Sequence, residues 1–232
     1  MAEKIGVQFE IGAAFPPDSR VARWATICAM ALNDLLLVNR WLVPRLQEEA
    51  PSEGYENVYL MRLAASHLFE VAVFLRAADR FPEVSDFVAG LDQEPREAYA
   101  ALLDLGRGDR DPFAVSIKDA RNSFSHYSEL LSEEAAKHER LRAALAAHAK
   151  EGTRSRIRDQ VPPLSGFRAH FADEVAVELM FPGGDREALG EFITGITTHI
   201  THFLLFVRAA LGAYAATLPP ELFDDWLDDE ED

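Results

Sequence analysis

The stretch LAASHLFEVAVFL, Leu63 to Leu75, decides the fold, because a helix with this sequence is apolar on nearly every side. Such a helix is stable only where other elements cover most of its surface. The apolar pattern continues in both directions along the chain, and we predict one helix from about Glu56 to Arg80. The sequence therefore predicts a protein built around a central helix.

Apolar residues recur at helical spacing on both sides of this stretch, after helix-start signals such as Pro16-Pro17-Asp18 and Asp111-Pro112. These patterns predict helices over about 18–47, 83–89, 95–105, 112–131, 132–150 and 185–217. Residues 153–184 differ, because EVAVELMF alternates apolar and polar positions and predicts a small β-hairpin. The expected fold class is all-α, a multi-helix up-down bundle with a small inserted β-hairpin.

The length of 232 residues allows one sizeable core, and we expect a single helical domain over 1–220, interrupted at 153–184 and followed by an acidic tail at 221–232. The single cysteine, Cys28, excludes an internal disulfide and fits a reducing compartment. The chain begins without a secretory pattern, and the late apolar segment HFLLFVRAALGAYAA, interrupted by Arg208, is too short to cross a bilayer. We expect a cytoplasmic protein with no membrane partner.

The stretch KDARNSFSHYSELL, Lys118 to Leu131, carries the residues that we single out for chemistry. Asn122 and His126 are four apart and therefore lie on one side of the predicted helix, roughly opposite its core face, with Arg121 on the flank. Ser125 and Lys118 lie in the same outward region. The core face is the apolar row of Phe113, Ile117, Ala120, Phe124, Tyr127 and Leu131.

A histidine that titrates near neutrality beside a permanent cation is what phosphate-ester chemistry needs. Attack by a ribose 2′-hydroxyl requires a base, an acid for the leaving 5′-oxygen and positive charge on the phosphate. This helix supplies one histidine, so two copies facing each other across a dimer would supply both acid–base roles.

RNSFSH, residues 121 to 126, resembles the Arg-(polar)-x-x-x-His motif of the HEPN superfamily, helical bundles that include many metal-independent endoribonucleases of toxin, antiviral and RNA-processing systems. The resemblance implies that Arg121 and His126 are the catalytic pair, that Asn122 supports them, and that the motif lies at a homodimer cleft. It implies RNA cleavage that leaves a 2′,3′-cyclic phosphate, without cofactor or metal, and an antitoxin or regulatory protein as partner. Tyr127 directly follows His126, so the modified tyrosine that one branch of the family carries two positions after its histidine is not matched.

Glu70 is a further candidate, because a carboxylate inside the most apolar helix needs a partner. Arg76, His67 or a motif residue of a facing helix could pair with it. Glu70, like Ser125, is a candidate to support the site; the alternatives for Glu70 are a structural ion pair or a partly exposed edge position. The segment from Lys137 to Arg158 is basic inside a chain of net charge −16, and clustered cations bind a phosphate backbone. The RNA-binding residues expected there are Arg140, Arg142, Lys150, Arg154, Arg156 and Arg158.

Three alternatives remain open at this stage. The motif helix could instead be an ordinary amphipathic helix, in which case the bundle is catalytically silent and binds a partner protein or a nucleotide. His199 and His202 lie three apart and could hold a metal only with a carboxylate that the spacing does not supply. RLAASH repeats the arginine-to-histidine spacing, but we interpret its His67 as a hydrogen-bonded core histidine.

Overall fold

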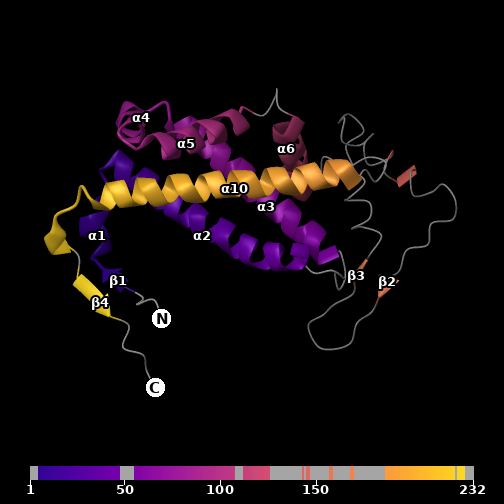
Figure 1. Cartoon of the computed structure of the whole chain (residues 1–232), viewed down its shortest axis with the longest axis horizontal. Coiled ribbons are helices and arrows are strands. Elements are labelled where there is room, and N and C mark those ends of the chain that lie inside the picture. The colour runs from indigo at the N-terminus through magenta and orange to yellow at the C-terminus, as the bar shows by residue number, and fades with distance from the viewer. Residues whose placement is uncertain are drawn as a thin grey trace, which may run out of the picture.

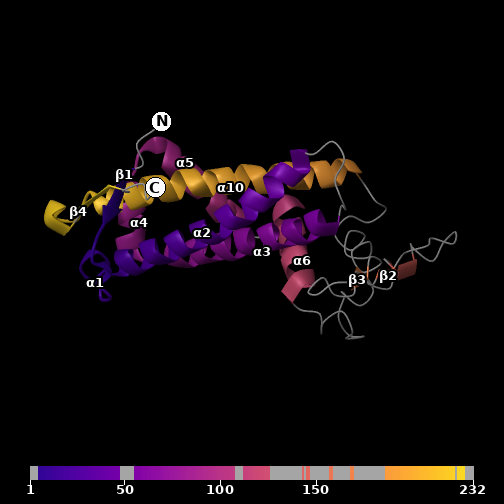
Figure 2. The ribbon, with the colours of Figure 1, turned by 90° about the horizontal axis from the view of Figure 1, so that it is seen from below.

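The computed structural model describes residues 5–47, 55–107, 112–125, 143, 145–146, 157–158, 168–169, 186–222 and 224–227. Three long helices set its length: α2 (Arg20–Gln47), α3 (Tyr55–Ala78) and α10 (Arg186–Ala215). They run side by side along the long axis, as Figures 1 and 2 show. The helices predicted over 18–47, 56–80 and 185–217 are confirmed to within a few residues at each end.

Shorter helices complete the bundle. They are α1 (Ile11–Ala14), α4 (Pro82–Ala89), α5 (Gln93–Leu105), α6 (Pro112–Ser125) and the 3-10 turn η1 (Pro220–Leu222). α5 packs on α10 and α3, and α6 packs on α3. α6 runs across the long helices instead of along them (Figure 2). The predicted all-α class is confirmed, because helix dominates the described part of the chain.

The core lies between α2, α3, α5 and α10. The central helix is buried where the sequence predicts it, with Leu68, Ala72 and Leu75 all at 0% exposure. Aromatic rings fill the core at the end where α4 lies: Trp24 packs edge-on against Phe87 and Phe206. Cys28 is buried in the same cluster, and desolvation raises the pKa of its thiol well above the ordinary range. The cysteine is therefore a packing residue.

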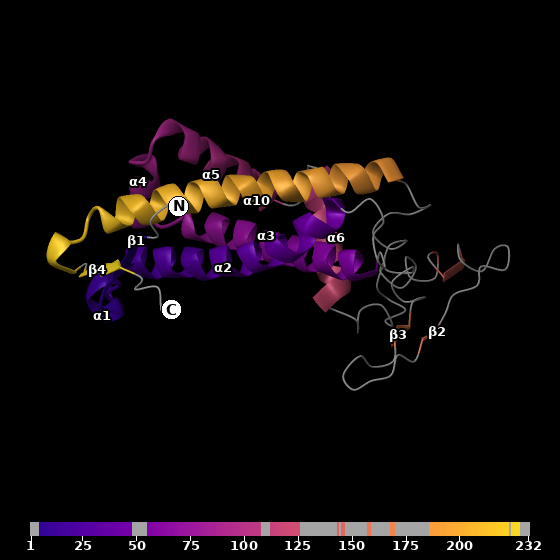
Figure 3. The same cartoon turned by 60° about the horizontal axis from the view of Figure 1, so that its bottom comes forward.

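Two short ladders accompany the helices. β1 (Ile5–Gln8) pairs antiparallel with β4 (Asp224–Leu227), beside α1 at one end of the molecule (Figure 3). β4 lies inside the predicted acidic tail, and its pairing with the N-terminal strand has no signal in the sequence analysis. β2 (Ile157–Arg158) pairs antiparallel with β3 (Arg168–Ala169). These four residues do not establish the hairpin predicted over 153–184, whose strand EVAVELMF lies outside the described residues.

Two stretches, Arg20–Val43 and Glu187–Ala215, are long and apolar enough to cross a membrane by length and composition. This is weak evidence, because core helices of soluble proteins pass the same test, and a third of each apolar window is buried in the bundle. α10 extends far beyond HFLLFVRAALGAYAA, so shortness of that segment no longer argues against a membrane span. The compartment stays a prediction.

Two glycines permit close contacts between helices. A Cβ on Gly106, at the end of α5, would lie 2.5 Å from the carbonyl oxygen of Ala72 on α3, so only glycine permits this approach. Arg76 donates to the Gly106 carbonyl at 3.2 Å and holds the same junction. A Cβ on Gly195 of α10 would lie 2.4 Å from the ring of Phe113, which packs flat in that space. The first contact holds the end of α5 against α3, and the second holds the start of α6 against α10.

Candidate functional site

The described part of the motif helix is α6, and its buried side faces α3. Ala114, Ile117 and Ala120 are completely buried, whereas Lys118 is exposed. The predicted core face is therefore confirmed at Ile117 and Ala120, and Phe113 is partly buried. Arg121 follows Ile117 by four residues, so it lies next along the buried row. Its side chain keeps 28% exposure, which places it at the edge of the interface between α6 and α3.

Arg121 and Glu70 form an ion pair between these two helices. The Nε of Arg121 donates to Oε1 of Glu70 at 2.8 Å, and Nη2 lies 2.6 Å from the same oxygen. Of the three partners considered for Glu70, the structure therefore selects a motif residue of the facing helix, while Arg76 bonds the Gly106 carbonyl. The Glu70 side chain is 55% exposed, in keeping with the partly exposed edge position considered for it. Hydrogen bonds between charged groups are short and directional, and they hold a side chain in place.

His67 lies one helical turn before Glu70 on α3 and faces α2. Its Nδ1 is 3.9 Å from Oδ2 of Asp34, and its side chain is 35% exposed. The interpretation of His67 as a hydrogen-bonded core histidine is wrong, because 3.9 Å is too long for a hydrogen bond and the ring reaches solvent. The distance is within ion-pair range when the imidazole is protonated. No spacing rule identifies this contact, since Asp34 and His67 come from different helices.

Four residues thus follow one another across three helices: Asp34 on α2, His67 and Glu70 on α3, and Arg121 on α6. We call this set the polar row. It contains two carboxylates, one guanidinium and one imidazole. With the imidazole protonated the formal charges cancel, so phosphate has to compete with Glu70 for Arg121.

The remaining candidates are not brought together by the described residues. Asn122 and Ser125 belong to α6, but their side chains are outside the described part of the chain, as is His126 entirely. Among the expected RNA-binding residues, only Arg158 has a described backbone, in β2, paired with Arg168. The others, Arg140, Arg142, Lys150, Arg154 and Arg156, lie outside the described residues.

His199 and His202 have mainly packing contacts. His199 stacks on Phe113 with ring centroids 5.0 Å apart, and its Nδ1 is 2.8 Å from the Gly195 carbonyl. The Nδ1 of His202 is buried without a hydrogen-bond partner. Within the described residues, no group of three metal-binding side chains occurs. The metal alternative for this pair therefore has no structural support in that part of the chain.

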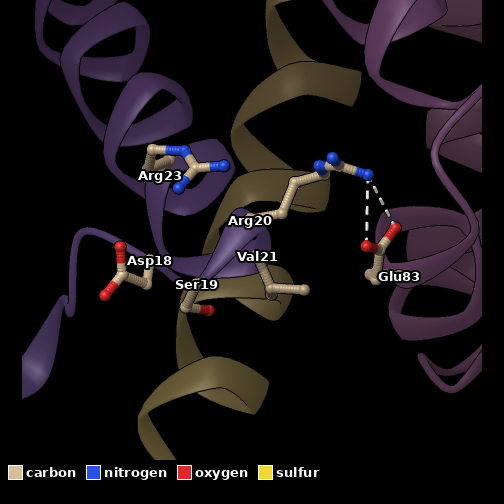
Figure 4. Close-up of a pocket in the computed structure, with 6 residues that line it drawn as sticks. All are labelled: Asp18, Ser19, Arg20, Val21, Arg23 and Glu83. Carbon is tan, nitrogen blue, oxygen red and sulfur yellow. Dashed lines mark hydrogen bonds and ion pairs between the residues drawn. The ribbon is translucent and has the colours of Figure 1, made fainter.

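A hollow of about 370 Å³ lies at the other end of the bundle, where α2 begins (Figure 4). Ser19 caps the helix by accepting a bond from the Ala22 N–H at 3.2 Å. Arg20 binds both oxygens of Glu83 on α4 at 3.1 and 3.0 Å and lies over the Phe81 ring. No pattern in the sequence predicts this pair, because 63 residues separate its partners. Helix capping and interhelical pairing account for its polar groups.

No protein-family model, no curated protein and no solved structure matches this chain. The resemblance to the HEPN superfamily therefore depends on RNSFSH and the helical context alone.

Proposed function

We propose that the protein is a homodimeric, metal-independent endoribonuclease of the HEPN type, active in a toxin, antiviral or RNA-processing setting. The observation that carries this proposal is the ion pair of Arg121 with Glu70. Arg121 is the motif side chain that the structure describes, and it is neither in the core nor loosely solvated. A carboxylate from the facing helix orients it at a partly exposed edge, where a phosphate oxygen can exchange with the Glu70 contact.

In this proposal His126 transfers a proton as general base or acid, and Arg121 stabilises charge on the pentacoordinate phosphate. Asn122 orients the reacting group or the bound RNA. The basic segment from Lys137 to Arg158 guides the RNA backbone, because it holds clustered cations in a chain of net charge −16. The hairpin insertion over 153–184 and the cytoplasmic location belong to the same proposal.

The second copy of the dimer needs a docking surface, and we assign it to α2. Ile27, Met30, Leu37 and Trp41 are exposed by 43%, 62%, 58% and 54%, and with Asp34 they follow the spacing of one helix face. We call the four apolar residues the α2 stripe. It spans about 21 Å at 1.5 Å per residue.

The α2 stripe is self-complementary. Two antiparallel copies related by a two-fold axis near Asp34 bring Ile27 of one copy opposite Trp41 of the other, and Met30 opposite Leu37. Exposed patches of this kind measure roughly 300–600 Å², against about 800 Å² per partner in a stable interface. The stripe is therefore the centre of the interface, and polar contacts around it complete the contact area. Leu37→Glu is expected to give monomers in sedimentation velocity, and an unchanged dimer assigns the contact to another surface.

The decisive test is His126→Ala. Purified protein, incubated with chelator and a mixed RNA pool, is expected to release fragments ending in 2′,3′-cyclic phosphate, and the variant to release none. Circular dichroism and thermal unfolding serve as controls for an intact fold. Cleavage by the variant at the wild-type rate rejects the assignment of His126, and an inactive wild-type protein rejects the nuclease.

The second candidate is a catalytically inactive bundle that binds a partner protein or nucleotide. The exposed α2 stripe favours it, because large exposed apolar patches mark binding surfaces. The cancelling charges of the polar row favour it too. This candidate predicts that the RNA pool stays intact with the wild-type protein under every condition tested.

A further inference from the structure

We propose that His67 and Arg121 act on the same phosphate, with His67 as an acid–base group and Asp34 as its positioning residue. The inference rests on the proposed nuclease function and changes the source of its second imidazole. The motif helix carries one histidine, and His67 supplies another from α3 within the same chain. The arginine-to-histidine spacing in RLAASH does not reveal this role, because it depends on the contact between α3 and α6.

The geometry begins with Glu70. His67 and Glu70 are three residues apart on α3, so they lie on one side of the helix with Cβ atoms about 5–6 Å apart. The Arg121 guanidinium contacts Glu70 at 2.6 and 2.8 Å. Imidazole and guanidinium therefore lie on the same side of α3 around one carboxylate. Both side chains are partly exposed, at 35% and 28%, so both reach a ligand that comes from solvent.

Asp34 gives His67 the arrangement of an oriented base. Its Oδ2 lies 3.9 Å from Nδ1 of the ring, beyond hydrogen-bond distance, and in the proposed role a bridging water joins the two groups and keeps the proton on Nδ1. The Nε2 is then the basic nitrogen. A base held by a carboxylate is the arrangement that recurs in sites where a hydroxyl group is activated.

The chemical step balances with two imidazoles, that of His67 and that of His126, the motif histidine of the proposed function. The neutral one takes the proton of the 2′-hydroxyl while the 2′-oxygen forms a bond to phosphorus. The bond from phosphorus to the 5′-oxygen breaks, and the leaving oxygen takes a proton from the protonated imidazole. The products are a 2′,3′-cyclic phosphate and a free 5′-hydroxyl. The two imidazoles have exchanged protonation states, and proton exchange with water restores them.

Glu70 sets the affinity of this site. A phosphate that binds Arg121 exchanges with the Oε1 contact of Glu70, because guanidinium donors suit carboxylate and phosphate oxygens equally. Phosphate affinity is therefore low in the wild-type protein. Glu70→Gln, which removes the competing charge, is expected to tighten phosphate binding several-fold. Glu83→Gln is the matched control, since Glu83 pairs with Arg20 on other helices.

A purely structural role for His67 makes a different prediction. Ion pairs between exposed groups stabilise proteins little, so removal of the imidazole would leave the rate of RNA cleavage unchanged. A role in proton transfer predicts a loss of roughly 10²- to 10⁴-fold in kcat for His67→Gln, with KM little changed. It also predicts that one limb of the pH–rate profile disappears. Asp34→Asn is expected to lower kcat less and to shift that limb.

The closing experiment combines these rates with a binding measurement that needs no activity. Histidine ring signals are followed by NMR while inorganic phosphate is added at constant ionic strength, with the His67 signal assigned through His67→Gln. We expect the His67 signal to shift and saturate in the wild-type protein and in Arg20→Ala, and to stay constant in Arg121→Ala. The His202 signal is expected to stay constant throughout.

Each outcome decides between the two proposals. Full RNA cleavage by His67→Gln overturns the role of His67 and leaves the nuclease standing. An inactive wild-type protein whose His67 signal responds to phosphate through Arg121 removes the nuclease and keeps the shared phosphate site. A His67 signal that ignores phosphate, or that shifts equally in Arg121→Ala, overturns the shared site itself.

Discussion

Two arginine–glutamate pairs join helices at different ends of this bundle, and they differ in what surrounds them. Arg20 binds both oxygens of Glu83 through one nitrogen, at 3.1 and 3.0 Å, and its guanidinium lies 4.3 Å from the centre of the Phe81 ring. Arg121 presents Nε and Nη2 to a single oxygen of Glu70, at 2.8 and 2.6 Å. The first pair connects the beginnings of α2 and α4. The second lies within α3 and α6, beside a histidine.

An ion pair alone therefore does not indicate a functional site; the groups around it have to be considered as well. Glu83 lies in the first turn of α4, where a carboxylate is favoured by the helix dipole, and Arg20 also contacts an aromatic ring. Local structure explains that pair. Glu70 has no such position, and His67, one helical turn before it on α3, lies 3.9 Å from the Asp34 carboxylate on α2. Equal substitutions in the two pairs therefore separate structure from function.

The largest contrast is expected from Arg121→Ala and Arg20→Ala. Loss of a group that stabilises transition-state charge lowers kcat by roughly 10²- to 10³-fold, so Arg121→Ala should nearly abolish RNA cleavage. Arg20→Ala should retain the wild-type rate. Initial rates on a labelled RNA, with thermal unfolding of both proteins, provide the measurement. Similar rates in the two variants would break the comparison.

The sequence was sufficient for the helices but not for the contacts between them. Periodicity over short ranges predicts α2, α3, α4, α5 and α10, because one face of each helix is buried in a common core. The pairing of Arg121 with Glu70 was one of three options, since 51 residues separate the partners. His67 was misinterpreted for the same reason: its neighbour Asp34 belongs to another helix. The β1–β4 ladder joins the two ends of the chain and leaves no local pattern.

The next contrast concerns two glycines, one in a close contact between helices and one in open space. In Gly106→Ala the new Cβ would lie 2.5 Å from the Ala72 carbonyl oxygen, so α5 and α3 must separate. Overpacking of this kind costs about 1–3 kcal/mol, and we expect α6 and Arg121 to shift with it, lowering the cleavage rate as well. Urea denaturation with rate measurements on the same samples tests both effects.

Gly212→Ala is the control for that substitution. Nothing lies within 4 Å of a Cβ at this position, which is exposed on α10. Alanine in a helix interior is favoured over glycine by about 0.5–1 kcal/mol, so the variant should be slightly more stable with unchanged activity. Equal destabilisation by the two substitutions would contradict the close approach at Gly106.

The smallest effect is expected in acid, at the Arg20 pair. A hydrogen bond from its own backbone N–H, followed by the charge and hydrogen bonds of Arg20, holds the pKa of Glu83 below its ordinary value of 4.5. A lowered pKa in the folded state means that ionised Glu83 stabilises the fold fully above pH 4.5 and loses this contribution as the pH falls through the lower folded value.

Arg20→Ala removes the charge and hydrogen bonds of Arg20 and keeps the backbone hydrogen bond. Its folded pKa should therefore lie between that of the wild-type protein and 4.5, and its stability should depend less on pH in that interval. Glu83→Gln should remove the dependence of this group altogether, and NMR titration of the Glu83 carboxyl measures the order directly. The same pKa in the wild-type protein and Arg20→Ala would show that the backbone bond alone stabilises the carboxylate, and that Arg20 is held there mainly by the Phe81 ring.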